Sequence, residues 1–289
     1  MTDPGPPPLT DGVVVLTPDG RERFSVVADG TTVGHVTLRE LADSTGELTW
    51  GVDDGDEMDA YASRAVSLVV SHAFDDRTLL RVQAKVAVDD GRSVRAARGS
   101  GLRNEGRIRA ADGSEYLLLA RLRDDAEPQG RAGFRALLNS FLPRTRVISQ
   151  VLVRDEQGRV LLCHPTYKDD WDLPGGVVER LESPHTAAGR EVVEELALDL
   201  PIGPLLLTDW LPPWGGWDDA VCTVFDAGVH AASVLDAAVL QAREIREIAF
   251  CTLEEVHDRA ADFTARRVMS ALAALAGDGP AYTESGRPV

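Results

Sequence analysis

The pattern of apolar and polar positions predicts two series of short strands and amphipathic helices along the chain. In the first half, apolar side chains at positions 62, 65, 66, 69, 70 and 73 recur at helical spacing and predict a helix. A second, shorter helix follows Asp90. Apolar runs bounded by turn residues predict the strands of this half: Val13–Leu16, Phe24–Val27, Thr31–Leu38, Glu47–Val52, Leu80–Val88, Arg103–Arg109 and Tyr116–Arg121.

The second half alternates strands and helices again. Ser183 and Pro184 form a helix start, because a serine side chain caps the first turn and proline fits its first position. Thr252 and Glu255 form a capping box for a later helix. The expected strands and the last helix are Val147–Val153, Arg159–Cys163, Leu205–Thr208, Ala220–Asp226 and Asp262–Ala276.

A polar junction with proline and glycine separates the halves and predicts two domains, as does a length of 289 residues. Within it, Phe134, Leu137, Leu138 and Phe141 share one face of a short helix, which we expect to pack between the domains. The expected division is a disordered start over 1–11, a first domain over 12–123, a linker with the short helix over 124–146, a second domain over 147–276 and a flexible tail over 277–289.

Charge and cysteine content narrow the classes of protein. The net charge of −17 is concentrated in the second half and no basic stripe offsets it, so we expect no nucleic-acid partner. No stretch approaches the ~20 apolar residues of a membrane span, and the N-terminus lacks the features of a signal peptide. Cys163, Cys222 and Cys251 lie in apolar runs and are expected to be buried thiols. The sequence therefore predicts a cytoplasmic protein without a membrane partner.

Three carboxylates share one face of the first helix of the second half. Glu191, Glu194 and Glu195 are spaced i, i+3 and i+4, and a purely structural helix gains nothing from three neighbouring anions. A hard divalent cation prefers such oxygen ligands. Gly175 and Gly176 would let the backbone approach a ligand closely. A solvated acidic helix face is the alternative interpretation.

The longer motif around these carboxylates resembles the Nudix box. The family pattern is matched here by Gly176, Glu182, Arg190, Glu191, Val192, Glu194, Glu195 and Leu198. One position departs, because Ala197 replaces the glycine that ends the family's helix. The resemblance covers about residues 147–257 and implies an α/β/α sandwich.

The resemblance implies a metal-dependent hydrolase that cleaves the diphosphate of a nucleoside diphosphate linked to another moiety. The cofactor would be Mg²⁺ or Mn²⁺, which activates water and neutralises developing charge. Its ligands would be the carbonyl of Gly175 and the carboxylates of Glu191, Glu194 and Glu195. Arg190 would orient the carboxylates, and the general base is left open between Glu191 and Glu244.

The order of elements in the first half resembles a GNAT-type acetyltransferase, which implies a mixed sheet with flanking helices over about residues 12–123. The residues that carry this resemblance are Trp50-Gly51-Val52, Tyr61-Ala62, Arg81-Val82, Ser93 and the run 101–106. In the family, backbone amides at a helix start bind the pyrophosphate of acetyl-CoA. The corresponding residues would be Ala60, Tyr61 and Ala62. Acidic residues crowd that helix start here, so we predict a degenerate domain that does not bind acetyl-CoA.

The expected fold class is thus α/β (α+β), with a GNAT-like domain followed by a Nudix domain. The expected function is hydrolysis of a small nucleoside diphosphate derivative, with the first domain as an accessory. Two alternatives remain open: a bifunctional enzyme that also transfers acetyl groups from acetyl-CoA, and a non-catalytic nucleotide sensor. A homodimer is compatible with the sequence.

Overall fold

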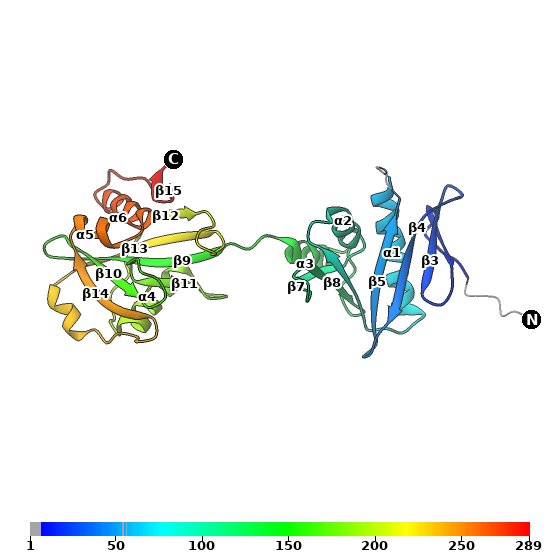
Figure 1. Ribbon diagram of the computed structural model, residues 1–289, viewed down its shortest axis with the longest axis horizontal. Coiled ribbons are helices and arrows are strands. Elements are labelled where there is room, and N and C mark those ends of the chain that lie inside the picture. The colour runs from blue at the N-terminus through cyan, green and yellow to red at the C-terminus, as the bar shows by residue number, and fades with distance from the viewer. Residues whose placement is uncertain (1–6, 54, 56) are drawn as a thin grey trace, which may run out of the picture. The chain divides into compact units, whose positions relative to one another are not determined.

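The computed structural model describes residues 7–53, 55 and 57–289, and it divides into two compact units with the boundary between Pro143 and Arg144 (Figure 1). The prediction of disorder over 1–11 lies partly outside the described residues. Within them it is wrong, because Leu9 and Thr10 pair with Leu16 and Val15. Backbone pairing with strand β2, Val14–Pro18, orders these residues. The local sequence alone does not indicate that pairing.

The first unit is built on one sheet with the strand order β1-β2-β3-β4-β5-β6-β8-β7. These strands are β1 Leu9–Thr10, β2 Val14–Pro18, β3 Arg23–Ala28, β4 Thr31–Glu40, β5 Thr45–Val52, β6 Arg81–Ala87, β7 Arg103–Arg109 and β8 Glu115–Leu122. Helix α1, Met58–Asp75, packs its alanine and valine face on this sheet, as the helical spacing predicts. Helix α2 spans Gly91–Gly99 and begins with Asp90 as its cap.

Strands β5 and β6 are parallel neighbours, but they pair only from Thr45–Arg81 to Leu48–Ala84. Beyond Leu48 the two strands separate, and a cavity of about 150 Å³ lies between them. A parallel pair that splays in this way leaves backbone groups free to meet a ligand.

The junction helix α3, Arg131–Phe141, belongs to the first unit. Its Leu137 is buried, and the hydroxyl of Ser140 accepts a hydrogen bond from the backbone N–H of Asn104 on β7. The sequence predicts that this helix packs between the domains. That stays a prediction: α3 lies beside β7 and buries Leu137, whereas Phe134 and Leu138 of its apolar face are exposed.

The second unit is a sheet with helices on both faces. Its strand order is β14-β10-β9-β13-β12-β15-β16, and β11 pairs with β9. The strands are β9 Arg146–Asp155, β10 Val160–Pro165, β11 Gly175–Val177, β12 Leu205–Leu211, β13 Ala220–His230, β14 Ile245–Cys251, β15 Tyr282–Glu284 and β16 Arg287–Pro288. The helices are α4 Pro184–Leu196, α5 Leu253–Arg259, α6 Asp262–Leu275 and the 3₁₀ segment Ala232–Ala237.

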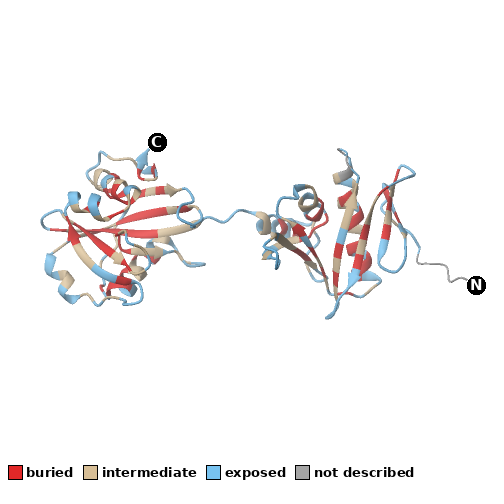
Figure 2. Ribbon diagram, in the orientation of Figure 1, coloured by how far each residue is buried: buried red, intermediate tan, exposed pale blue. Residues whose placement is uncertain are grey.

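Strand β9 contributes side chains to two separate cores of this unit, and Figure 2 shows its buried stretch. Val151 and Val153 pack with Val192 of α4, whereas Leu152 packs with Val268 of α6. Successive side chains of a strand point to opposite faces, so one strand serves both layers. The α/β/α sandwich implied by the sequence is therefore confirmed.

The segment 277–289 is the clearest departure from the sequence prediction, which made it a flexible tail. Tyr282–Glu284 forms β15, parallel to β12, and Arg287–Pro288 folds back on it as β16. The pairing adds this segment to the sheet of the second unit, so the prediction of a loose tail is wrong for its last residues.

One sequence prediction about composition is met. The three cysteines are buried free thiols. No described helix is both long enough and apolar enough to cross a membrane.

Candidate active site

Helix α4 positions the carboxylates, and its two ends follow from local sequence. The Ser183 hydroxyl accepts a hydrogen bond from the N–H of Thr186 at 3.2 Å, with Pro184 as the first helical residue. At the other end Ala197 adopts the left-handed conformation, with φ 55°, and its N–H reaches the carbonyl of Val193. Helix α4 thus ends in a left-handed residue although that residue is an alanine.

Arg190 gathers three glutamates at one edge of the site. Its Nε and Nη2 donate to the two oxygens of Glu182, each at 2.9 Å. Its Nη1 donates to Glu191 at 2.9 Å and to Glu194 at 2.8 Å. The guanidinium holds the pKa of Glu182 at about 2. The structure therefore brings Arg190 into contact with two of the predicted metal ligands and with the loop that precedes the helix.

Glu195 lies apart from this ion-pair network and is buried. Its carboxylate accepts a hydrogen bond from the N–H of Gly175 at 2.9 Å. Burial raises the pKa of Glu195 to about 8, and the charges of Glu191, Glu244 and Asp172 act in the same direction. Among the described residues no cationic side chain forms an ion pair with Glu195, so its carboxylate has unused capacity to bind a cation.

The glycines of β11 allow the chain to pass close to these groups. A β-carbon on Gly175 would lie 2.1 Å from the carbonyl oxygen of Ser149, and its φ is +139°. A β-carbon on Gly176 would lie 2.7 Å from either carboxylate oxygen of Glu191. Position 175 therefore requires glycine, because the obstructing atoms are backbone, whereas a β-carbon at position 176 would displace the end of the Glu191 side chain.

Glu244 lies just before β14 and is exposed. Its backbone N–H donates to the carbonyl of Gln241. Its charge raises the pKa of Glu191 and of Glu195. The second candidate for the general base is thus near the carboxylate cluster, although no hydrogen bond joins it to Glu191.

The predicted metal site stays a prediction. Among the described residues, no group of three or more His, Cys, Asp or Glu side chains is arranged to hold a metal ion. The donor chemistry nevertheless fits a hard cation, because the groups are carboxylates and Glu195 is a buried one whose pKa is far above its ordinary value. Arg190 donates to one oxygen of Glu191 and to one oxygen of Glu194.

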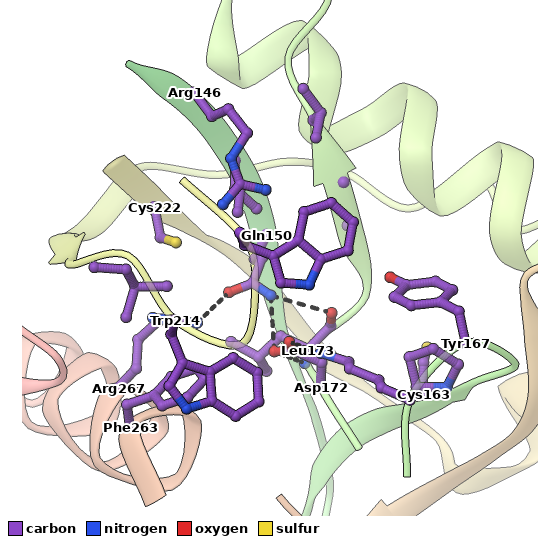
Figure 3. Close-up of a pocket in the computed structure, with 18 of the residues that line it drawn as sticks. Arg146, Gln150, Cys163, Tyr167, Asp172, Leu173, Trp214, Cys222, Phe263 and Arg267 are labelled. Carbon is purple, nitrogen blue, oxygen red and sulfur yellow. Dashed lines mark hydrogen bonds and ion pairs between the residues drawn. The ribbon is translucent and has the colours of Figure 1, made fainter. Parts of the chain in front are cut away.

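A cavity of about 290 Å³ opens beside Glu195 and Gly175 (Figure 3). Trp214 and Trp217, from the loop between β12 and β13, form part of its wall with Phe263 of α6. The rings of Trp214 and Phe263 meet edge to face, with centroids 5.4 Å apart. The position of both tryptophans on the cavity makes their rings available to a ligand.

A chain of hydrogen-bonded polar groups borders this cavity, and sequence reasoning missed it. Arg267 donates from Nε to Asp209 at 2.8 Å and from Nη1 to Gln150 at 3.0 Å. The Gln150 amide donates in turn to Asp172 at 2.8 Å, and Lys168 donates to the same carboxylate at 2.6 Å. Figure 3 shows the contacts of Gln150 with Arg267 and Asp172. A charged residue among the apolar positions of α6 is the one signal that the sequence offered.

The predicted cofactor residues of the first unit lie at the start of α1. The N–H groups of Ala60 and Tyr61 both donate to the carbonyl of Glu57 at 3.1 Å, and Ala62 is part of the core. Asp59 accepts hydrogen bonds from Arg92 and Arg95 of α2. Two further acids of the predicted cluster, at positions 54 and 56, lie outside the described residues.

Comparison with known proteins agrees with the division of the chain into two units. Residues 143–272 match the family model described as NUDIX domain, and residues 15–103 match the acetyltransferase (GNAT) domain. A MutT-like protein of Streptomyces ambofaciens is 40% identical over 58 residues, 20% of this chain and 37% of that protein. The matched region thus spans well under half the length of that curated relative.

Solved structures are similar to each unit separately. A MutT protein from Methanosarcina mazei Go1 is 23% identical, with 45% of this chain and 95% of that chain covered and a TM-score of 0.39. A GNAT-family acetyltransferase from Bacillus anthracis is also 23% identical, with coverage of 36% and 68% and a TM-score of 0.34. The GNAT match thus lies within the first unit, and the NUDIX match covers most of the second.

Proposed function

We propose that the second unit is a metal-dependent Nudix pyrophosphohydrolase that cleaves the diphosphate of a nucleoside diphosphate linked to another moiety. The observation that carries this proposal is the buried carboxylate of Glu195, which borders a cavity and has a pKa raised to about 8. The NUDIX domain match over residues 143–272 supports the same activity.

The groups that would hold Mg²⁺ or Mn²⁺ are the carbonyl of Gly175 and the carboxylates of Glu191, Glu194 and Glu195. A bound divalent ion supplies charge neutralisation of the diphosphate and a water of lowered pKa. Arg190 keeps Glu191 and Glu194 in place through its hydrogen bonds to both. In the metal-loaded protein we expect Arg190 to retain Glu182, its bidentate partner, and to release carboxylate oxygens to the ion.

Proton transfer from the attacking water falls to Glu191 or Glu244. Burial raises the pKa of Glu191, and the charges of Glu194 and Glu244 raise it further, while Arg190 opposes them. A carboxylate with a raised pKa is the better proton acceptor near neutral pH. Glu191 is therefore our first choice as general base, with Glu244 as the alternative.

Product release from a panel of nucleoside diphosphate sugars, dinucleotides, CoA and nucleoside triphosphates tests the proposal, with Mg²⁺ or Mn²⁺ present. We expect turnover that requires metal and is lost in Glu195→Gln. Glu254→Gln, which makes the same change at an exposed position of α5, should keep full activity. Metal-independent turnover, or full activity in Glu195→Gln, would contradict the assignment. Tight nucleotide binding without turnover of any compound would instead favour the sensor.

For the first unit we propose an accessory role without acetyl-CoA. Asp59 supports this, because its carboxylate accepts hydrogen bonds from Arg92 and Arg95 beside the helix start where the family holds a pyrophosphate. Calorimetric titration of the full chain with acetyl-CoA should give no heat of binding at micromolar concentrations. Saturable binding would support the bifunctional enzyme and overturn this part of the proposal.

A further inference from the structure

The last two strands bring a turn to the wall of the cavity beside Glu195. Strands β15 and β16 follow residue 272, where the NUDIX match ends. The turn between them, residues 283–286, is held against β12 by the N–H of Ser285, which donates to the carbonyl of Trp210 at 2.8 Å. Ser285 also lines the cavity. A segment outside the matched family region therefore contributes to the cavity wall.

Asp209, on β12, is fully buried and is the main partner of the 283–286 turn. Its Oδ1 accepts hydrogen bonds from the hydroxyl of Thr283 and from the N–H of Gly286, both at 2.7 Å. Its Oδ2 accepts a hydrogen bond from the Nε of Arg267 at 2.8 Å. A buried carboxylate costs free energy unless its oxygens are hydrogen-bonded and its charge is paired. The turn therefore supplies two donors that hold this carboxylate, and Arg267 supplies the opposite charge.

The 283–286 turn also lies directly on α6. A β-carbon on Gly286 would lie 2.6 Å from the Cβ of Arg266 and 2.6 Å from the backbone nitrogen of Arg267. The hydroxyl of Ser270 donates to the carbonyl of Gly286 at 3.1 Å, and the Nε of Arg266 donates to the carbonyl of Ser285 at 2.9 Å. The turn thus fixes the part of α6 whose two arginines line the cavity.

Arg267 connects Asp209 with Gln150 of β9. Its Nη1 donates to the Oε1 of Gln150 at 3.0 Å, which fixes the orientation of the amide and directs its Nε2 away from the guanidinium. That nitrogen donates to the carboxylate of Asp172 at 2.8 Å and lies 3.5 Å from the carbonyl oxygen of Leu173 (Figure 3). Both ends of the amide are therefore engaged, one by Arg267 and the other by the segment that precedes β11.

The segment 172–174 leads directly into Gly175, whose carbonyl is a predicted metal ligand. The carboxylate of Asp172 also accepts a hydrogen bond from the Nζ of Lys168 at 2.6 Å. The N–H of Gly175 donates to the carboxylate of Glu195 at 2.9 Å. A shift of this segment therefore moves both the carbonyl of Gly175 and the N–H group that orients Glu195.

We propose that Asp209 is a positioning residue of the candidate active site. The 283–286 turn holds Asp209, and Asp209 holds Arg267, so that Gln150 braces the segment before Gly175. The inference rests on the proposed function for the reaction that this arrangement supports, whereas the restraint on Gly175 does not depend on it. A misplacement of about 1 Å, even from a change far from the reacting atoms, can lower a rate about a hundredfold. Loss of one donor to Asp209 therefore loosens Gly175 and lowers kcat more than it changes KM.

Amide hydrogen exchange of the metal-free full chain, followed by NMR, tests the restraint directly. Thr283→Val removes one donor to Asp209, and Thr283→Ser retains it. Rates are compared with that of the amide of Val192 in α4, because a general loss of stability speeds both. We expect the N–H of Gly175 to exchange about three- to tenfold faster on this ratio in Thr283→Val, and at the wild-type ratio in Thr283→Ser. Val256→Ala removes two buried methyl groups of α5 and lowers stability, but should leave the ratio unchanged.

Turnover with Mg²⁺ tests the consequence for the reaction. At a temperature where every variant is folded, we expect the kcat of Thr283→Val to fall about tenfold, with KM changed by about twofold at most. Thr283→Ser and Val256→Ala should stay near the wild type in both constants. If the wild type hydrolyses none of the compounds, the proposed function fails, and the exchange ratio still decides whether Asp209 restrains Gly175.

Should Thr283→Val fail to fold, Ser270→Ala loosens the same turn by removing the donor to the carbonyl of Gly286, and the same increase is expected. An unchanged exchange ratio in the folded variant, or an equal increase in Val256→Ala, would overturn the restraint. An equal increase in Thr283→Ser would show that the hydroxyl is not its source. A raised ratio with unchanged kcat in an active hydrolase would leave Asp209 a purely structural residue.

Discussion

The carboxylate of Glu191 lies against the backbone of Gly176, so that a β-carbon on Gly176 would be 2.7 Å from each of its oxygens. This contact places the candidate general base directly against strand β11, whose two glycines line the cavity. The two glycines of β11 therefore differ in role. Gly175 has a positive φ, whereas Gly176 leaves room for the Glu191 carboxylate.

Gly176→Ala should reduce activity much more than stability. The obstructing atoms belong to the end of a flexible glutamate, so Glu191 can rotate away at little cost to the fold but then leaves its position for catalysis. We expect a loss of about 10²-fold in kcat with a change in Tm of a few degrees at most. Gly189→Ala is the control, because its nearest neighbour beyond the helix is 3.5 Å away and alanine favours a helix. Equal activity of the two variants would contradict the role of this contact.

The stability of the metal-free protein should depend on the ionisation of Glu195. Its pKa is raised from 4.5 to about 8 in the folded state, so the unfolded chain loses its proton first as the pH rises. The folded state therefore loses stability between about pH 4.5 and pH 8. Glu195→Gln should match the wild type near pH 4 and exceed its Tm at pH 8, both measured with a chelator.

Added Mg²⁺ at pH 8 should raise the Tm of the wild type more than that of Glu195→Gln, because an ion stabilises the folded state that binds it. Glu254→Gln provides the reference for a neutralised exposed glutamate. A variant at position 195 that is less stable than the wild type at pH 8 without metal would show that the buried charge is already compensated.

Ala197→Gly should stabilise the protein. Ala197 holds φ 55° at the end of α4, and a left-handed conformation costs a non-glycine residue about 1 kcal/mol. We expect a gain of about 1 kcal/mol and a Tm higher by about 2–4 °C, measured by thermal unfolding of the metal-free protein. Ala197→Val should lower the Tm, because a β-branched side chain fits this conformation worse. The opposite order of the two variants would mean that the helix ends differently.

Removal of one buried hydroxyl on β15 should lower the stability of the protein. Thr283 donates to Oδ1 of Asp209 at 2.7 Å, and both residues are fully buried. Thr283→Val leaves that carboxylate oxygen with one donor fewer and should cost about 1–3 kcal/mol in the free energy of unfolding. Thr283→Ser retains the hydroxyl and should lose less. If denaturant unfolding gives the same value for both variants, the hydrogen bond contributes nothing measurable.

The sequence predicts the carboxylate helix well because its determinants are local. The cap at Ser183, the first-turn proline and the spacing of the glutamates all lie within one segment, and the structure keeps each of them. Strand predictions succeed for the same reason wherever apolar residues alternate or cluster, as along β9.

Other features depend on partners that are distant in the chain. Arg267 meets Asp209 and Gln150 across separations of 58 and 117 residues, so nothing near α6 indicates that its charge is balanced. The segment after residue 277 has few apolar residues of its own, and it becomes a strand only because β12 offers an edge to pair with. The hydrogen bonds from Arg190 to Glu191 and Glu194 likewise depend on side-chain rotamers, and the spacing of these residues in the sequence does not determine the rotamers.

The contacts of Asp209 also set an order of events during synthesis. Thr283 follows Asp209 by 74 residues, and Gly286 follows it by 77, so the ribosome makes the carboxylate long before these two donors. The sheet of the first unit finds all its described strand pairs before Pro143 and has no such delay. Domains generally fold as units during translation, starting from the N-terminus. The nascent second unit therefore lacks two hydrogen-bond donors to Asp209 and part of its cavity wall at a stage when the first unit can already fold.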